Sequence, residues 1–269
     1  MVNSINNNMA NLWTPIFLPF GSLANWYDST DTTTLTLSTG NKVADWRDKS
    51  YNNNNLSETD FADLPVYGTT NINGLSTVDF DEATSINLDD EVVPLVGDCY
   101  IMYVGFNNTY TTASTMYNFT GTGASSLLIR QVGGGNTQLL IKAAGGTNIN
   151  NLSLILPLEN QTAVYTVDIQ GLDVTLEGNY SSSIAQAGTE AYTPLNTLTI
   201  GAQNGDVNGL NGQVGELIVM QSDNITVADK EKLEGYTAWK WNMQGSLPGA
   251  HPYKTAAPTV TDVEFRNKL

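Results

Sequence analysis

The stretch of sequence that decides the fold covers residues 99–106 and reads CYIMYVGF. Side chains of a β-strand point alternately to its two faces. Here the odd and the even positions are both apolar, so a strand formed by this stretch would be buried on both sides. We therefore expect a central strand in a layered β-structure.

Short β-prone segments lie on both sides of this stretch, separated by turns rich in Asn, Asp and Gly. Two hairpins are signalled clearly. Residues 126–132 and 138–143 flank a Gly-rich turn, and residues 163–167 and 172–176 flank a Gln-Gly pair. The other predicted strands are residues 34–37, 42–46, 77–80, 85–88, 197–201 and 213–221. About twelve strands without a helical pattern between them favour a sandwich of two antiparallel sheets.

One helix is predicted near the end of the chain. Thr226 is a suitable N-cap, and Asp229 three residues later can return the capping contact. From Leu233 to Trp241 the larger side chains follow the spacing i, i+3, i+4, i+7 and i+8. The pattern predicts a helix over about 227–243 that packs one face on the sandwich.

The charge balance excludes several classes of partner. The chain has 11 Lys and Arg against 27 Asp and Glu, a net charge of -16. This charge repels phosphates and no basic cluster counteracts it, which disfavours nucleic acid and anionic membranes as partners. With one cysteine, Cys99, and one histidine, His251, the chain has no intrachain disulfide framework and no His-cluster metal site, and His-dependent catalysis is disfavoured.

The start of the chain carries no sign of a signal peptide or a membrane span. The first residues lack a basic region and a continuous apolar run. Residues 13–20 are apolar but are interrupted by prolines and too short to cross a bilayer. We expect synthesis in a cytoplasm and no membrane insertion.

The sequence predicts an extended N-terminal arm at residues 1–20, the sandwich with its helix at residues 21–254, and a polar tail at residues 255–269. The apolar residues of the arm need a surface to cover, which makes them candidate assembly contacts. They are Trp13, Pro15, Phe17 and Phe20.

Several motifs resemble the laminin-G-like domains of the concanavalin A-like lectin/glucanase superfamily, which occur in phage virion and bacterial surface proteins. The matching stretches are LWTP at 12–15, WYDSTD at 26–31, VADWRDKS at 43–50, NG at 73–74, VDFD at 78–81, GQVGELIV at 212–219, KLEGYTAWKW at 232–241, LP at 247–248 and HPYK at 251–254. The resemblance covers about residues 12 to 255. All five tryptophans lie within these motifs, which favours packing over sugar stacking as their role.

The resemblance implies an all-β, concanavalin A-like jelly-roll sandwich of two antiparallel sheets with one C-terminal α-helix alongside. It implies adhesion or carbohydrate recognition more often than catalysis. The glucanases of the superfamily carry catalytic acids as Glu-x-Asp-x-Glu on one strand face. Here Asp79 and Asp81 share a face but Glu82 falls on the other, so the spacing fails and we expect no enzymatic activity.

The first functional hypothesis is a non-enzymatic structural protein on the surface of a phage virion, as a capsid decoration or head-fibre protein. It follows from the resemblance, the missing signal peptide, the absence of disulfides and the terminal arm. Its partners would be other virion proteins and further copies of the chain, for example in a trimer. The alternative is a carbohydrate-binding module or tail adhesin that recognises a host-surface polysaccharide.

Two sets of candidate ligand-binding residues emerge. Polar and aromatic side chains suited to a saccharide lie in a predicted loop, namely Asn107, Asn108, Tyr110 and Tyr117. The pair Asp28 and Asp31 consists of carboxylates, which suit Ca²⁺, although Asx turns are the alternative and the spacing of an EF-hand loop is absent. No other cofactor is required.

Overall fold

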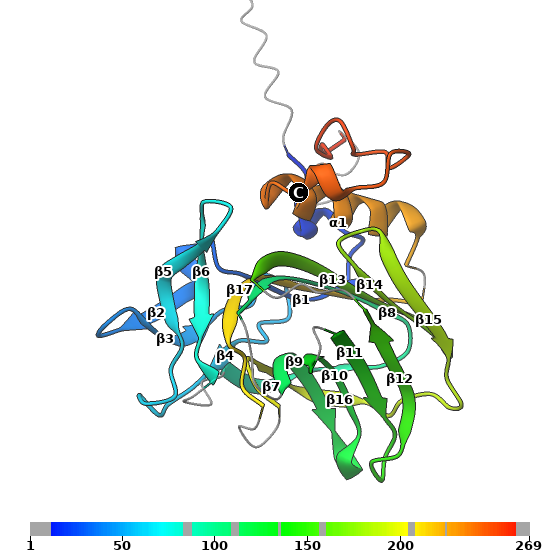
Figure 1. Ribbon diagram of the computed structural model, residues 1–269, viewed down its shortest axis with the longest axis horizontal. Coiled ribbons are helices and arrows are strands. Elements are labelled where there is room, and N and C mark those ends of the chain that lie inside the picture. Colours follow the sequence, from blue (N-terminus) through cyan, green and yellow to red (C-terminus); the bar gives the residue numbers. More distant parts are fainter. Residues whose placement is uncertain are drawn as a thin grey trace, which may run out of the picture.

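Two layers of antiparallel strands and one covering helix make up the computed structural model (Figure 1). The structure describes residues 12–82, 88–108, 113–133, 136–155, 160–203, 208–223 and 225–261. Tyr110 and part of the predicted strand at 85–88 lie outside these residues. The observed architecture confirms the expected jelly-roll sandwich with one C-terminal α-helix.

The helix-side sheet is built around β8 (Cys99–Asn107), which pairs with β13 (Gln161–Gln170) and β17 (Gly212–Gln221). Its further strands are β14 (Asp173–Gly178) and β15 (Ser182–Ala187) beyond β13, and β1 (Leu23–Asp28) and β6 (Leu75–Phe80) beyond β17. Figure 1 shows α1 lying over the outer face of this sheet.

The far sheet is built around β9 (Ala113–Gly121), which pairs with β10 (Ser126–Val132) and β16 (Leu195–Ile200). Its further strands are β11 (Asn136–Lys142), β12 (Asn148–Leu154) and β7 (Leu88–Leu95). Four further strands join the two sheets along one edge, namely β2 (Leu35–Ser38), β3 (Lys42–Trp46), β4 (Leu56–Ser57) and β5 (Val66–Ile72).

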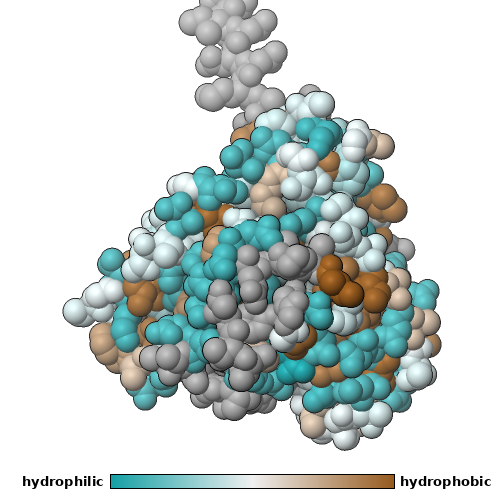
Figure 2. Space-filling model, in the orientation of Figure 1, coloured by the Kyte–Doolittle hydropathy of each residue, from teal (hydrophilic) through white to brown (hydrophobic). Residues whose placement is uncertain are grey.

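Strand β8 is buried on both faces, as its sequence predicts. Ile101 and Tyr103 belong to the core between the sheets. Met102 and Val104 belong to a second apolar cluster that lies between this sheet and the helix layer. The strand is therefore central to both layers of packing. On the face seen in Figure 2, apolar patches are separated by hydrophilic side chains.

Helix α1 (Val227–Lys240) begins with the predicted capping box between Thr226 and Asp229. It packs through Leu233 and neighbouring residues on the second apolar cluster. The helix ends at Lys240 because Asn242 has a positive φ of 55°, and a short 3-10 turn (Gln244–Ser246) follows. No helix in the described ranges is long and apolar enough to cross a membrane.

The first described segment differs from the expected extended arm. Trp13 and Leu18 are each only 1% exposed and belong to the apolar cluster under α1. The Trp13 amide donates to the carbonyl of Pro258 at 3.0 Å, and Leu12 forms a β-bridge with Thr259. Residues 12–18 are therefore part of the folded domain, because their apolar side chains find their surface within this chain.

Candidate functional site

The best-defined polar cluster lies under α1. It joins side chains from three of the sequence motifs, those at residues 26–31, 212–219 and 232–241. Glu216 is fully buried on β17. Its Oε1 accepts hydrogen bonds from Trp26 Nε1 at 2.7 Å and from the Tyr236 hydroxyl at 2.8 Å. Its Oε2 accepts from Trp241 Nε1 at 2.8 Å and lies 3.1 Å from Lys240 Nζ. Both oxygens are occupied by groups of the same chain, so this carboxylate holds the fold together rather than a ligand.

Asp28 belongs to the same cluster. Lys240 Nζ lies 2.6 Å from its Oδ1, and Lys49 Nζ lies 2.8 Å from its Oδ2. Burial opposes ionisation, but the two lysines outweigh it and lower the pKa of Asp28 to about 2. Lys49 also lies 2.9 Å from Asp31, whose pKa is lowered chiefly by hydrogen bonds from Thr33.

This pairing bears on the calcium expectation for Asp28 and Asp31, which stays a prediction. The ammonium groups already supply the positive charge that a bound cation would bring, and they face the oxygens that it would need. Within the described ranges, no group of three or more His, Cys, Asp and Glu side chains is arranged to hold a metal ion.

The saccharide-binding residues predicted for a loop are not gathered at the surface. Asn107 ends β8 and Tyr117 lies in the middle of β9, and both are fully buried. The ring of Tyr117 packs 6.0 Å from that of Tyr103 between the sheets. Asn108 is half-buried and donates to Asn211 Oδ1 at 3.0 Å.

The physical reason is that Asn107 belongs to β8 and that residues 113–117 of the expected loop belong to β9. Neither the Asn107 amide nor the Tyr117 hydroxyl has a partner among the residues that the structure describes. Ordered water commonly satisfies such interior groups. Their placement indicates an internal role.

The predicted assembly residues also divide. Trp13 and Pro15 are buried and Phe17 is half-buried against the cluster under α1. Phe20 is 89% exposed, and its ring lies 6.2 Å from that of Tyr51, which is 56% exposed. The two rings border a cavity of about 160 Å³. Of the four candidates, only Phe20 presents most of its surface to solvent.

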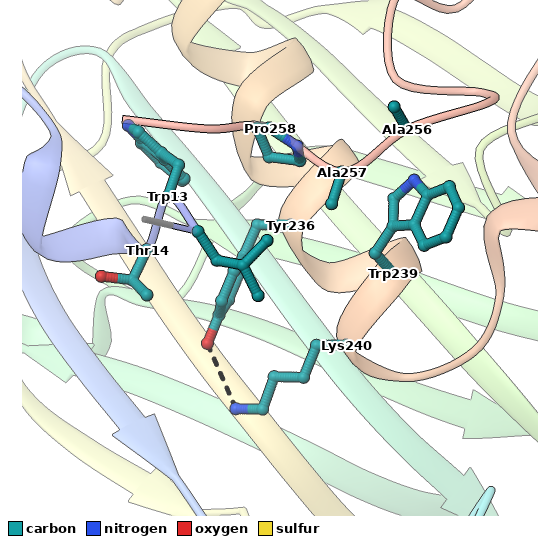
Figure 3. Close-up of a pocket in the computed structure, with 9 residues that line it drawn as sticks. Trp13, Thr14, Tyr236, Trp239, Lys240, Ala256, Ala257 and Pro258 are labelled. Carbon is teal, nitrogen blue, oxygen red and sulfur yellow. Dashed lines mark hydrogen bonds between the residues drawn. The ribbon is translucent and has the colours of Figure 1, made fainter. Parts of the chain in front are cut away.

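An apolar groove, the helix groove, lies where the first and last described segments meet α1. Its volume is about 540 Å³. Figure 3 shows Trp13 and Trp239 on opposite sides of the groove, with the Tyr236 hydroxyl directed at Lys240. Trp239 Nε1 donates to the Tyr253 carbonyl. The Tyr236 hydroxyl donates to Glu216, and Lys240 Nζ donates to Asp28. These polar groups are occupied, which suits the groove poorly to sugar hydroxyls.

A second groove, the polar groove, lies on the outer face of the far sheet and has a volume of about 310 Å³. Thr120, Ser126 and Lys142 are direct cross-strand neighbours on β9, β10 and β11. Asn118 lies two residues before Thr120 on the same face. The described residues that line it are Asn118, Thr120, Gly121, Ala124, Ser125, Ser126, Lys142 and Gln203.

Hydrogen-bonding capacity is left unused in the polar groove. Asn118 is 1% exposed, and its Oδ1 has no partner among the described residues. Lys142 is half-buried and forms no ion pair with any residue that the structure describes. The described residues that line the groove include no carboxylate. The sequence signal for Asn118 is its position between Tyr117 and Phe119, which point inward, but it is visible only once β9 is recognised as a strand.

Comparison with known proteins supports the class of fold. No protein-family model and no curated protein matches the chain by sequence. The chain is similar to domain 4 of AbnA, a GH43 extracellular arabinanase from Geobacillus stearothermophilus, in complex with arabinotriose. The TM-score is 0.52 at 14% identity, over 77% of this chain and 96% of that one.

Two botulinum neurotoxin structures give similar scores. The type G receptor-binding domain matches with a TM-score of 0.57 at 9% identity over 83% of this chain, and the serotype D binding domain with 0.54 at 11% over 78%. The matches span about half of those chains, 51% and 50%. The chain is therefore a jelly-roll β-sandwich, and the two neurotoxin structures that share this fold are binding domains.

A titratable group beside α1 gives a first prediction. Burial raises the pKa of Glu177 on β14 to about 7, and the carboxylates of Glu234 and Asp168 add to the shift. Lys230 lies beside Asp168, 2.5 Å away. Because the folded pKa is above the unfolded value, the native state binds more protons and stability falls as pH rises from about 4.5 to 7.

Glu177→Gln should remove this part of the pH dependence. After allowance for solvent screening, we expect the variant to gain about 1–2 kcal/mol relative to the parent between pH 4.5 and pH 8. Urea unfolding of both proteins at the two pH values measures the difference. An equal change with pH in the two proteins would show that Glu177 ionises normally.

Proposed function

We propose that the chain is a non-catalytic carbohydrate-binding domain whose ligand lies in the polar groove. The observation that carries the proposal is the buried Asn118 amide, whose Oδ1 has no protein partner in the described structure. Leaving such a group unpaired costs about 1–3 kcal/mol, and a sugar hydroxyl that donates to it would recover this. Saccharide sites are concave and carry a few placed polar groups, as this groove does.

The similarity to an arabinanase domain solved with arabinotriose and to receptor-binding domains supports the same function. We further propose membership among the laminin-G-like domains, an assignment that rests on the sequence motifs. A neutral sugar needs no metal in the polar groove, since amide, hydroxyl and ammonium groups line it.

The test is binding to an array of neutral and acidic oligosaccharides, followed by titration calorimetry on each binder. Asn118→Ala should weaken binding at least about tenfold, because one or two hydrogen bonds to the ligand are lost. Gln170→Ala is the matched control, since Gln170 is an exposed amide on β13 of the helix-side sheet, away from the groove. The proposal fails if no saccharide binds, or if Asn118→Ala binds as tightly as the parent.

We propose as a second candidate a structural role on a particle surface, such as capsid decoration or a head fibre of a phage virion. The exposed pair of Phe20 and Tyr51 supports it, because two neighbouring aromatic rings in solvent are an efficient anchor for another protein. The two roles are compatible, since this pair and the polar groove involve different residues.

A further inference from the structure

Two basic side chains on the outer face of the far sheet lack acidic partners. Lys142 lines the polar groove, and Arg130 lies on the neighbouring strand β10. Neither forms an ion pair within the described part of the chain. Lys42, Arg47 and Lys254 form none there either, but their charged groups bond to backbone carbonyls. Both cations lie in a protein that carries a net charge of -16.

Arg130 is held in place rather than free. Its Nε donates to Gln138 Oε1 at 2.9 Å, and Gln138 Nε2 donates to Asn151 Oδ1 at 2.8 Å. The terminal nitrogens of the guanidinium form no hydrogen bond to any described residue. Burial lowers the pKa of Arg130, and no carboxylate compensates this desolvation. The side chain is therefore positioned by its neighbours while its charge is unmatched.

Strand register places the two cations on one face. Ser126 pairs with Lys142 and Arg130 pairs with Gln138 between β10 and β11. Leu127 and Ile129 point into the core, so Ser126 and Arg130 point outward. Four residues separate Ser126 from Arg130, which sets the cations roughly 13 Å apart along the strands at about 3.3 Å per residue. A single sugar ring cannot reach both, but a short oligosaccharide can.

The surroundings favour a ligand with sparse negative charge. No carboxylate is among the described residues that line the groove, and the register places Glu91 of β7 four strands from Lys142, roughly 19 Å at about 4.8 Å per strand. The charge of the whole chain repels a densely charged polymer more strongly than a lightly charged one. The planar fork of arginine matches the geometry of a carboxylate.

We propose that this face binds an acidic saccharide whose sugar units carry carboxylates, with Lys142 and Arg130 each facing a carboxylate and Asn118 bonding a hydroxyl. The inference rests on the proposed carbohydrate-binding function and names the class of its ligand. It adds Arg130, which lies outside the lining of the polar groove, as a residue that determines specificity.

The test compares each acidic oligosaccharide with its own methyl ester, which keeps the sugar and removes the charge. Uronic-acid trimers and sialyl-oligosaccharides are the probes, with neutral arabino-oligosaccharides and dextran sulfate alongside. At least one acid should bind about tenfold or more tightly than its ester, as a charge-assisted hydrogen bond implies. The preference should weaken as the salt concentration rises.

Lys142→Gln and Arg130→Gln should each lower the preference for the acid over the ester about tenfold, and Arg130→Lys should retain part of it. Arg47→Gln is the matched control, because Arg47 is exposed and its guanidinium bonds to the Thr33 carbonyl elsewhere on the surface. Circular dichroism confirms that each variant is folded.

The outcomes separate the two proposals. Equal binding of acids and esters, or binding of neutral sugars alone, would overturn this inference and leave the carbohydrate-binding function standing. Binding of dextran sulfate alone would overturn the assignment to carboxylated sugars. If no saccharide binds, the proposed function fails and the inference falls with it.

Discussion

Replacing Glu216 with glutamine should lower the free energy of unfolding by about 3–5 kcal/mol, the usual cost of breaking a buried ion pair from one side. Glu216 is fully buried. Its two oxygens accept hydrogen bonds from Trp26, Trp241 and Tyr236 and form an ion pair with Lys240. An amide has one oxygen, so one indole N–H would face an NH₂ group instead of an acceptor. Lys240 would also lose part of its compensating charge.

Urea denaturation at pH 7, followed by tryptophan fluorescence, measures the loss. Glu91→Gln serves as the control, because Glu91 is an exposed glutamate on the far sheet, where a surface substitution changes stability by about 0.5 kcal/mol or less. A loss below about 1 kcal/mol for Glu216→Gln would show that the cluster under α1 is not a stabilising centre.

Replacing Trp13 with alanine should cost a similar amount, about 3–5 kcal/mol, which is typical of a buried tryptophan. Trp13 is 1% exposed and packs edge-on against Tyr236 of α1, with ring centroids 6.3 Å apart. Thermal and urea unfolding both report the change. A segment that served only as an arm for docking would tolerate the substitution without loss of stability.

Phe20→Ala is the matched control in the same segment. Phe20 is 89% exposed, so its removal should change stability by about 0.5 kcal/mol or less. If the chain is attached to a particle through the pair of Phe20 and Tyr51, the same variant should reduce incorporation into particles while folding normally. Comparable small effects of the two substitutions would contradict the packing of residues 12–18.

The central strand, the two hairpins and the helix could be predicted because their patterns are local. Residues 99–106 are apolar on both faces, and the capping box marks the start of α1 within one residue. Strand β9 could not be predicted in this way. It reads ASTMYNFTG, and its outward positions are Asn and Thr, which are also the residues of exposed loops.

The candidate site could not be predicted from the sequence, because the register of the strand pairings brings its residues together. Asn118 and Lys142 are far apart in the sequence and come to one groove only because β9, β10 and β11 pair side by side. A shift of one residue in any of these pairings would turn the side chains to the opposite face. The same limit explains Tyr117, whose inward direction follows from pairing and not from its neighbours in sequence.

The bridge between Leu12 and Thr259 brings the first and the last described segments together on one side of the domain. The described segments at both ends pass beside α1, on the outer face of the helix-side sheet, whereas the polar groove opens on the outer face of the far sheet. The two described ends and the polar groove thus lie on opposite faces of the domain. The surface that we assign to saccharides therefore points away from the face that carries the two described ends.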